Sequence, residues 1–283
     1  MKSIVVTGAS SGIGRKISQT LVSRGFRVFG SVRKTSDGKA VAAELGENFV
    51  PLIFDVTDRE AEDVAAVQVE GVLKGEKLAG LINNAGIAVV GAVQTLSPDE
   101  FQKQFDVNLM GVFHCTQAFL DILRADTSRT GAAGKIINIS SVAGDLAMPL
   151  FGAHNMSKFG LEGFSEALRR ELMMFSIDVV MIAPGPIKTP IWEKFDGDKL
   201  AKQAVNSAYK KPLERMLSYS DQMKQSGLPP EVIANRVLAI LQENKTKTRY
   251  KIDAQWVQNT LMARLPKRVA DRMIVRQMGL RQE

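Results

Sequence analysis

The chain has 283 residues, of which 45% are hydrophobic and 24% are charged, a composition that excludes a disordered chain and a coiled coil. Its net charge of +7 falls in residues 245–283, which carry ten basic and three acidic residues, so the body has no broad basic face for nucleic acid. One cysteine and two histidines are too few for a disulfide framework or a typical zinc site, so we expect no metal.

Membrane and export signals are also absent from the sequence pattern. No apolar run reaches the ~20 residues that span a bilayer. The first apolar stretch is too short for a signal peptide and runs directly into a glycine turn. We therefore expect a cytoplasmic protein.

Short apolar runs alternate with helical patterns along the chain, which predicts βαβ units. The expected fold is α/β, a Rossmann-type doubly wound parallel sheet of about seven strands with helices on both faces, because several runs carry consecutive β-branched residues. No linker separates a second domain, so residues 1–283 are expected to form one domain. The predicted strands span residues 3–7, 27–32, 50–54, 80–83, 135–140, 178–183 and 249–252.

The turn after the first predicted strand reads Gly8-Ala9-Ser10-Ser11-Gly12-Ile13-Gly14. Gly8 permits a tight turn, Gly12 allows the backbone to approach a pyrophosphate, and Gly14 allows the helix to pack close to the strand. Free N–H groups and the dipole at the start of that helix favour phosphate. Although tight turns also use glycines, their position directly after a buried strand predicts a dinucleotide site.

The end of the second predicted strand indicates which dinucleotide binds. An acidic residue there would bind the ribose 2′-hydroxyl of NAD(H). This strand instead ends in Ser31-Val32-Arg33-Lys34, and an arginine in the position of Arg33 can pair with a 2′-phosphate. The pattern favours NADP(H) over NAD(H); the less favoured alternative is that Arg33 and Lys34 are simply solvated surface residues.

Later segments of the chain predict helices and a lid. Ser97, Pro98 and Glu100 have the pattern of a capped helix start, and a second helix is expected over residues 154–175. Residues 190–228 break the alternation and are expected to form a substrate lid. Apolar residues recur at near-helical spacing between basic ones over residues 254–283, which predicts a basic helical extension.

By its motifs, the sequence resembles the short-chain dehydrogenase/reductase family, strongly over residues 3–190 and loosely over the rest. The resemblance implies an NADP(H)-dependent oxidoreductase, closest to the steroid- and retinol-type members. The motifs occur in the family's order: Thr7-Gly8-x-x-x-Gly12-x-Gly14, Asp55-Val56, Asn83-Asn84-Ala85-Gly86, Asn108, Ser140-Ser141, Lys158 and Pro184-Gly185.

The resemblance also implies particular cofactor contacts. Asp55, followed by Val56, would contact the adenine, and residues 83–86 would line the cofactor site. Residues 184–189 would pass the nicotinamide, where Ile187 would bind the carboxamide through its backbone and Thr189 would lie near the phosphates.

The family's catalytic group is Asn, Ser, Tyr and Lys, which here implies Asn108, Ser141 and Lys158, with His154 at the tyrosine position. Ser141 lies thirteen residues before His154, the family's usual offset, so the substitution is not a shift of frame. A carbonyl that accepts hydride needs a proton donor, and in the family the lysine lowers the pKa of that donor, binds the nicotinamide ribose and joins a relay through the asparagine. Lys158 would disfavour the imidazolium form of His154.

Three interpretations of His154 remain open. The protein can be a reductase that uses His154 directly or through a water, because histidine suits acid–base work. It can be an ordinary reductase in which the tyrosine was replaced, by engineering or natural variation, with impaired turnover. It can also be an NADP(H)-binding protein with a non-redox or regulatory role. The presence of Asn108, Ser141 and Lys158 favours the first two.

The substrate wall is expected to be apolar, which suggests a hydrophobic alcohol and its ketone or aldehyde, such as a steroid, retinoid or other lipid-like molecule. By resemblance, a homodimer or homotetramer is implied. The basic tail is expected to cap the pocket or a subunit interface, and the alternative is contact with an anionic membrane surface. The candidate wall residues are Leu146, Met148, Pro149, Leu150, Phe151, Trp192, Phe195, Met216, Tyr219 and Met223.

Overall fold

The computed structural model describes residues 1–123, 129–194 and 208–280. Within them, seven strands form one parallel sheet in the order β3-β2-β1-β4-β5-β6-β7. The order reverses between β1 and β4, and ligands of such sheets bind in the crevice outside the carboxyl ends of the strands at that point. The predicted doubly wound α/β fold is therefore confirmed.

Each predicted strand is present, and its ends differ from the expected ones by one residue at most. The strands are β1 Ser3–Val6, β2 Arg27–Val32, β3 Phe49–Ile53, β4 Gly80–Asn83, β5 Lys135–Ile139, β6 Asp178–Pro184 and β7 Arg249–Ile252. Side chains of β1 alternate between the two faces: Ile4 and Val6 belong to one apolar cluster and Val5 to the other. Both faces of the sheet are thus buried, which explains its continuous apolar strands.

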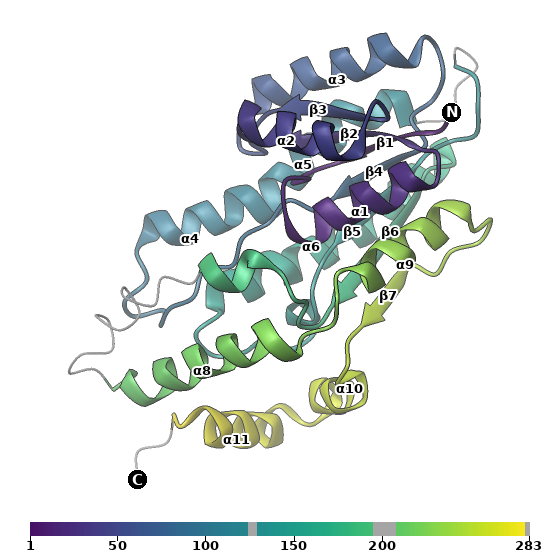
Figure 1. Ribbon diagram of the computed structural model, residues 1–283. Coiled ribbons are helices and arrows are strands. Elements are labelled where there is room, and N and C mark those ends of the chain that lie inside the picture. Colours follow the sequence, from purple (N-terminus) through teal and green to yellow (C-terminus); the bar gives the residue numbers. More distant parts are fainter. Residues whose placement is uncertain (124–128, 195–207, 281–283) are drawn as a thin grey trace.

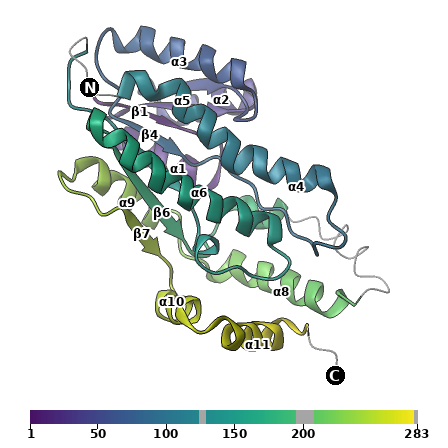
Figure 2. The same ribbon diagram turned by 180° about the vertical axis from the view of Figure 1, so that it is seen from behind.

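Helices cover both faces of the sheet (Figures 1 and 2). One cluster joins the sheet to α1 Gly12–Ser23, α2 Thr35–Leu45 and α9 Glu231–Gln242. The cluster on the opposite face includes α3 Arg59–Leu73, α5 Gly111–Leu123 and α6 Gly152–Glu171, which a short 3-10 turn extends to Phe175. The helix expected over residues 154–175 is present with this mixed geometry.

A π-helical turn, Asp106–Met110, joins α4 Pro98–Phe105 to α5. The predicted start of α4 is confirmed, since the Ser97 side chain accepts a hydrogen bond from the Glu100 backbone N–H. Such π turns insert one extra residue into a helix and often mark functional sites. Here the turn carries Asn108, whose side chain is 1% exposed.

The segments after β6 extend away from the carboxyl edge of the sheet (Figure 1). They comprise the 3-10 turn Pro190–Lys194, α8 Lys210–Ser226 and, after β7, α10 Trp256–Arg264 and α11 Lys267–Met278. Arg215 on α8 donates hydrogen bonds to the Arg276 and Gln277 carbonyls at the end of α11, so it fastens these two helices together. No helix in the described residues is long and apolar enough to cross a membrane.

Candidate active site

Two adjoining pockets open at the carboxyl edge of the sheet. The first has a volume of about 490 Å³ and runs past the ends of β1, β2 and β4. Its lining includes most of the residues expected to hold a dinucleotide: Gly8, Ser10, Ser11, Gly12, Ile13, Arg33, Asp55, Val56, Ala85, Gly86 and Thr189. The second pocket has a volume of about 530 Å³ and shares Ile13, Gly86 and Thr189 with the first, so the two are continuous.

The glycine turn has the geometry that its sequence predicts. Gly8 and Gly12 have φ angles of +69° and +56°, in the left-handed region that side chains disfavour. A side chain at Gly14 would collide with the Gly8 carbonyl oxygen, so only glycine lets α1 approach β1 so closely. The turn therefore leaves backbone N–H groups and the N-terminus of α1 at an open cleft that fits a pyrophosphate.

Thr7 connects this turn to the segment after β4. Its hydroxyl accepts hydrogen bonds from the Asn84 and Ala85 backbone N–H groups at 3.0 and 2.9 Å. Asn83 differs from its predicted cofactor role: its buried amide donates to Asn138 on the neighbouring strand at 2.9 Å, and it lines neither pocket. Successive side chains of a strand point to opposite faces, so Asn84 lines both pockets in its place.

At the far end of the first pocket, Arg33 follows β2 and is exposed. Its guanidinium lies 4.0 Å from the Asp55 carboxylate, a loose pair that leaves most of its donors open to the cleft. Ser31, which was not predicted, also lines this pocket, and its hydroxyl accepts a hydrogen bond from the Gly8 N–H. No carboxylate follows β2 in the position that would meet a ribose 2′-hydroxyl.

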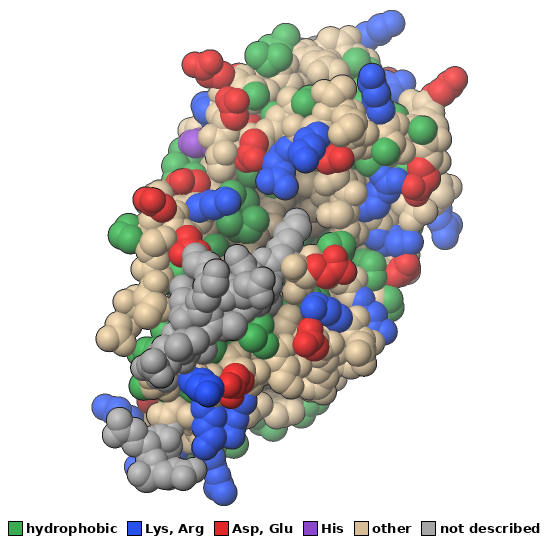
Figure 3. All heavy atoms as spheres, turned by 60° about the vertical axis from the view of Figure 1, so that its left-hand side comes forward, with side chains coloured by type: hydrophobic (Ala, Val, Ile, Leu, Met, Phe, Trp, Pro, Cys, Tyr) green, Lys and Arg blue, Asp and Glu red, His purple; other side chains and the backbone are tan. Residues whose placement is uncertain are grey.

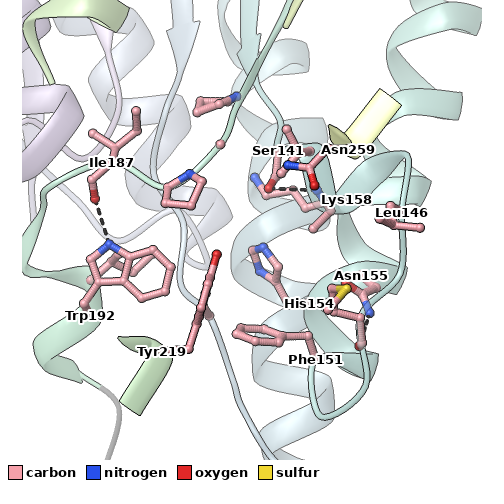
Figure 4. A pocket seen from close by; sticks show the side chains of 18 of the residues that line it. Ser141, Leu146, Phe151, His154, Asn155, Lys158, Ile187, Trp192, Tyr219 and Asn259 are labelled. Carbon is pink, nitrogen blue, oxygen red and sulfur yellow. Dashed lines mark hydrogen bonds between the residues drawn. The ribbon is translucent and has the colours of Figure 1, made fainter. Parts of the chain in front are cut away.

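The second pocket brings Ser141, His154 and Lys158 together (Figure 4). Ser141 follows β5 and caps a short 3-10 turn, with its hydroxyl accepting from the Ala143 N–H at 3.1 Å. Lys158 lies on α6, and its buried ammonium donates to the Ile139 carbonyl at 2.9 Å. Burial lowers the pKa of Lys158 to about 8, against the attraction of Glu162.

Asn108 supports the pocket from behind and does not line it. Its amide oxygen accepts from the Ile87 N–H at 2.9 Å, and its amide nitrogen donates to the Ile87 carbonyl at 3.0 Å. Gln104, which the sequence analysis did not single out, makes a similar pair of hydrogen bonds. Its amide oxygen accepts from the Val89 N–H, and its amide nitrogen donates to the Ile87 carbonyl. The Asn108 amide nitrogen also donates to the Ser157 hydroxyl at 3.3 Å, while Lys158 bonds to the Ile139 carbonyl.

His154 has an unusual environment for an acid. Its Nδ1 atom is buried and has no hydrogen-bond partner among the described residues. Burial, followed by the neighbouring Lys158 ammonium, lowers the pKa of His154 to about 3, while a hydrogen bond with the Ile87 backbone acts in the opposite direction. The imidazole is therefore neutral at pH 7, as the position of Lys158 one helical turn away predicts.

The other side of the pocket is formed by the 3-10 turn Pro190–Lys194 and by α8. The Trp192 indole donates to the Ile187 carbonyl at 2.7 Å, and its ring makes an edge contact with Tyr219 on α8, with centroids 6.3 Å apart. Seven of the ten candidate wall residues line this pocket: Leu146, Met148, Pro149, Phe151, Trp192, Met216 and Tyr219. Leu150 and Met223 do not, and Phe195 lies outside the described residues.

Several polar lining residues were missed because they belong to the tail and to α8. Gln255, Gln258 and Asn259 come from the start of α10, and Gln277 comes from α11. Buried Asp253 positions α10 by accepting from the Gln255 N–H and the Asn259 amide, and it packs so closely on Gly185 that no side chain fits there. Pro184, Gly185 and Ile187 line the same pocket from β6 onward. The tail thus caps the pocket, one of the roles expected of it, although the sequence did not indicate which of its residues face the chamber.

The short chain dehydrogenase family model matches residues 2–200. The chain therefore belongs to the short-chain dehydrogenase/reductase family and is an oxidoreductase. It is 36% identical to an NADPH-dependent 3-dehydrocapnine reductase of Ornithobacterium rhinotracheale over 278 residues, or 96% of each chain. It is 38% identical to retinol dehydrogenase 5 of Homo sapiens over 189 residues, which covers 66% of this chain and 57% of that protein.

Solved structures agree with this assignment. A short-chain dehydrogenase from Streptomyces avermitilis superposes with a TM-score of 0.77 at 27% identity, over 98% of this chain and 97% of that one. A short-chain dehydrogenase/reductase from Burkholderia phymatum in complex with NAD also superposes with a TM-score of 0.77, over 96% of this chain and 95% of that one. At 22% identity, this similarity is one of fold alone.

Proposed function

We propose that the protein is an NADP(H)-dependent oxidoreductase that interconverts a hydrophobic alcohol and its ketone or aldehyde, of steroid-, retinoid- or other lipid-like type. The observation that carries this proposal is the joined pair of pockets, with Ser141 and Lys158 where an apolar chamber adjoins the glycine-turn cleft. Apart from Lys158 and Arg215, no charged side chain in the described residues lines that chamber. The names of the reductase and retinol dehydrogenase relatives agree with carbonyl–alcohol chemistry.

The residues of the first pocket fit a nicotinamide dinucleotide. The glycine turn and the N-terminus of α1 would hold the pyrophosphate, Asp55 and Val56 the adenine, and the Ile187 backbone the nicotinamide end. When bound, the cofactor supplies or accepts the hydride. Arg33 supports NADP(H) over NAD(H), because its guanidinium can form charge-assisted bonds to a 2′-phosphate.

At the reacting end, the Ser141 hydroxyl would hydrogen-bond the substrate oxygen. The buried Lys158 ammonium places positive charge beside the site, where it stabilises a developing alkoxide and anchors the ribose. His154 would be a poor donor, since its neutral imidazole has no acidic proton at pH 7. A positioned acid is worth about 10²–10⁴-fold in rate, so the absence of tyrosine at this position slows turnover by the share of that factor that no other side chain supplies.

The test compares the chain as it stands with its His154→Tyr variant. NADPH and NADH binding are titrated by fluorescence, and NADPH oxidation is followed with apolar ketones and aldehydes beside small polar ones. We expect both forms to bind NADPH equally, the variant to reduce apolar carbonyls faster, and Arg33→Ala to weaken NADPH binding but not NADH binding.

Lack of NADPH binding would refute the cofactor assignment. Turnover of small polar carbonyls alone would refute the substrate class. Tight NADPH binding with no turnover of the panel by either form would favour the non-redox or regulatory alternative.

We also propose two contacts for the assembled protein. The outer face of α6 presents Met156 and Phe159, which are 42% and 45% exposed, beside exposed Gly160, and would pair with a second copy. The outer face of the tail combines apolar and basic side chains and would rest on an anionic membrane surface. Figure 3 shows Lys and Arg side chains gathered at the C-terminal end of the molecule.

A further inference from the structure

A reductase needs a proton for the substrate oxygen, and the group at the family's donor position is a neutral imidazole. Of the described residues that line the substrate pocket, one carries a phenol: Tyr219, on the lid helix α8. In Figure 4 the Tyr219 ring stands across the pocket from His154, with its hydroxyl directed toward the end where Ser141 and Lys158 lie. A phenol thus remains in the chamber, contributed by a different element.

Two sets of contacts fix where this phenol lies. Its ring packs edge-on against Trp192, and Trp192 is hydrogen-bonded to the Ile187 carbonyl at the proposed nicotinamide end. Its hydroxyl also lies within electrostatic reach of the Asp253 carboxylate, which packs against Gly185 in the same segment. The Tyr219 ring therefore lies in the substrate pocket beside Trp192, on the side of the chamber that Ile187 and Gly185 also line.

We propose that Tyr219 is the proton donor of this enzyme, hydrogen-bonding the substrate oxygen opposite Ser141. This inference rests on the proposed function. It assigns to the lid the role that a residue of α6 has elsewhere in the family, and it makes Tyr219 a catalytic residue in addition to a wall residue.

The chemistry balances without another reactant. In the reduction, the carbonyl carbon gains a hydride from the cofactor, the C=O π bond breaks, and the oxygen takes the Tyr219 phenolic proton. The product is the neutral alcohol and a phenolate, which regains a proton from water. Tyr219 is 41% exposed, so solvent can reach it without crossing the protein core.

The electrostatics of the pocket are compatible with donation by this phenol. Burial and the Asp253 carboxylate raise the pKa of Tyr219 above its ordinary value of 10, so the proton is present throughout the neutral range. An alkoxide is still far more basic than a phenolate, so transfer remains downhill.

A double-mutant cycle tests the assignment. Tyr219→Phe is made in the chain as it stands and in the His154→Tyr variant, with Tyr209→Phe as the matched control, because it removes a hydroxyl near the start of α8 outside the pocket. We expect Tyr219→Phe to lower kcat/KM with NADPH at least 100-fold in the original chain and less than about 3-fold in His154→Tyr. A merely structural role would cost both backgrounds equally.

A second readout does not depend on turnover. Calorimetry on the cofactor-free protein compares an apolar ketone with the analogue in which the carbonyl is a methylene group. Tyr219→Phe should weaken ketone binding about 5-fold and leave binding of the methylene analogue unchanged. Equal effects on the two ligands would overturn the inference.

The outcomes separate this inference from the proposed function. If His154→Tyr turns over and Tyr219→Phe behaves like Tyr209→Phe in the original chain, Tyr219 is not the donor and the proposed function stands. If neither form turns over, the redox function fails and the assignment of Tyr219 as proton donor fails with it, whatever the calorimetric comparison shows.

Discussion

Glu62 and Cys115 form a buried pair between α3 and α5, away from both pockets. The Cys115 thiol donates to one carboxylate oxygen of Glu62 at 3.0 Å, and the other oxygen has no partner among the described residues. The Glu62 side chain is fully buried, and burial raises its pKa to about 7. Burial and the adjacent Glu62 also raise the pKa of Cys115, so the thiol stays protonated and unreactive.

This pair makes the stability of the fold depend on pH. Because the folded-state pKa of Glu62 lies above its unfolded value of 4.5, its folded form holds a proton more tightly, and the free energy of unfolding should fall as pH rises from about 4.5 through about 7. The loss should be roughly 3 kcal/mol, at about 1.4 kcal/mol per pKa unit. Denaturant unfolding of Glu62→Gln at pH 5, 6.5 and 8 should show a flatter pH dependence.

The matched control is Glu60→Gln, which makes the same change at an exposed position of α3. If Glu60→Gln and Glu62→Gln altered the pH dependence alike, burial of the Glu62 carboxylate would not be its cause.

At the scale of elements, α6 has two different faces. The inner face carries His154 and Lys158 into the substrate pocket, whereas the outer face leaves Met156 and Phe159 uncovered. Pairing of this face between two copies would therefore lie directly behind the reacting groups and would stiffen the helix that carries them.

We expect the protein to be a dimer or tetramer in solution, and Phe159→Glu to shift its mass toward the monomer, because a charge cannot be buried unpaired at an apolar interface. Light scattering after size-exclusion chromatography measures this. Val64→Glu, on an exposed position of α3, should leave the mass unchanged. A monomeric unmodified protein, or equal effects of the two substitutions, would contradict the pairing.

Elements governed by local rules were predictable from the sequence. The strands follow from runs of β-branched residues buried on both faces, the glycine turn from its spacing, and the start of α4 from its Ser97 cap. The π turn at Asp106–Met110 could not be predicted from the sequence, because one extra residue in a helix leaves the helical pattern on either side of it intact. The position of α10 and α11 at the pocket depends on long-range packing. The burial of Asn83 likewise depends on a partner distant in the sequence, because its side chain bonds to Asn138 on the neighbouring strand.

On the scale of the whole molecule, the excess of positive charge lies in the C-terminal tail. The tail residues Trp256, Val257 and Leu261 are at least half exposed, and α11 places Arg268, Arg272 and Arg276 one turn apart from one another. The opposite faces of both helices line the substrate pocket. A membrane resting on the outer face would therefore lie next to the chamber for apolar substrates.

We expect the protein to bind vesicles that contain phosphatidylserine at low salt and to release them at high salt. Replacing Arg268, Arg272 and Arg276 with glutamine should weaken binding about 100-fold, at about 1 kcal/mol per charge near the surface. Vesicle co-sedimentation measures this. Glutamine at the exposed Arg24, Lys39 and Lys74 makes the same change in charge elsewhere and should have little effect.

Equal weakening by the two triple variants would show only a general charge effect. Failure of the unmodified protein to bind anionic vesicles would reject the contact, and a change in molecular mass of the tail variant without vesicles would assign the face to a second copy instead.

The nucleotide cleft and the far side of the substrate chamber come from successive parts of the chain, and this order has a consequence for how the enzyme is synthesised. Among the described residues, those that line the nucleotide cleft lie between Gly8 and Ile191, whereas α8, α10 and α11, which complete the substrate chamber, come later. Synthesis proceeds from the N-terminus, so the ribosome delivers these nucleotide contacts before any of the three helices. A nascent chain that met its nucleotide early would gain stability from that ligand while the part that chooses the substrate was still being translated.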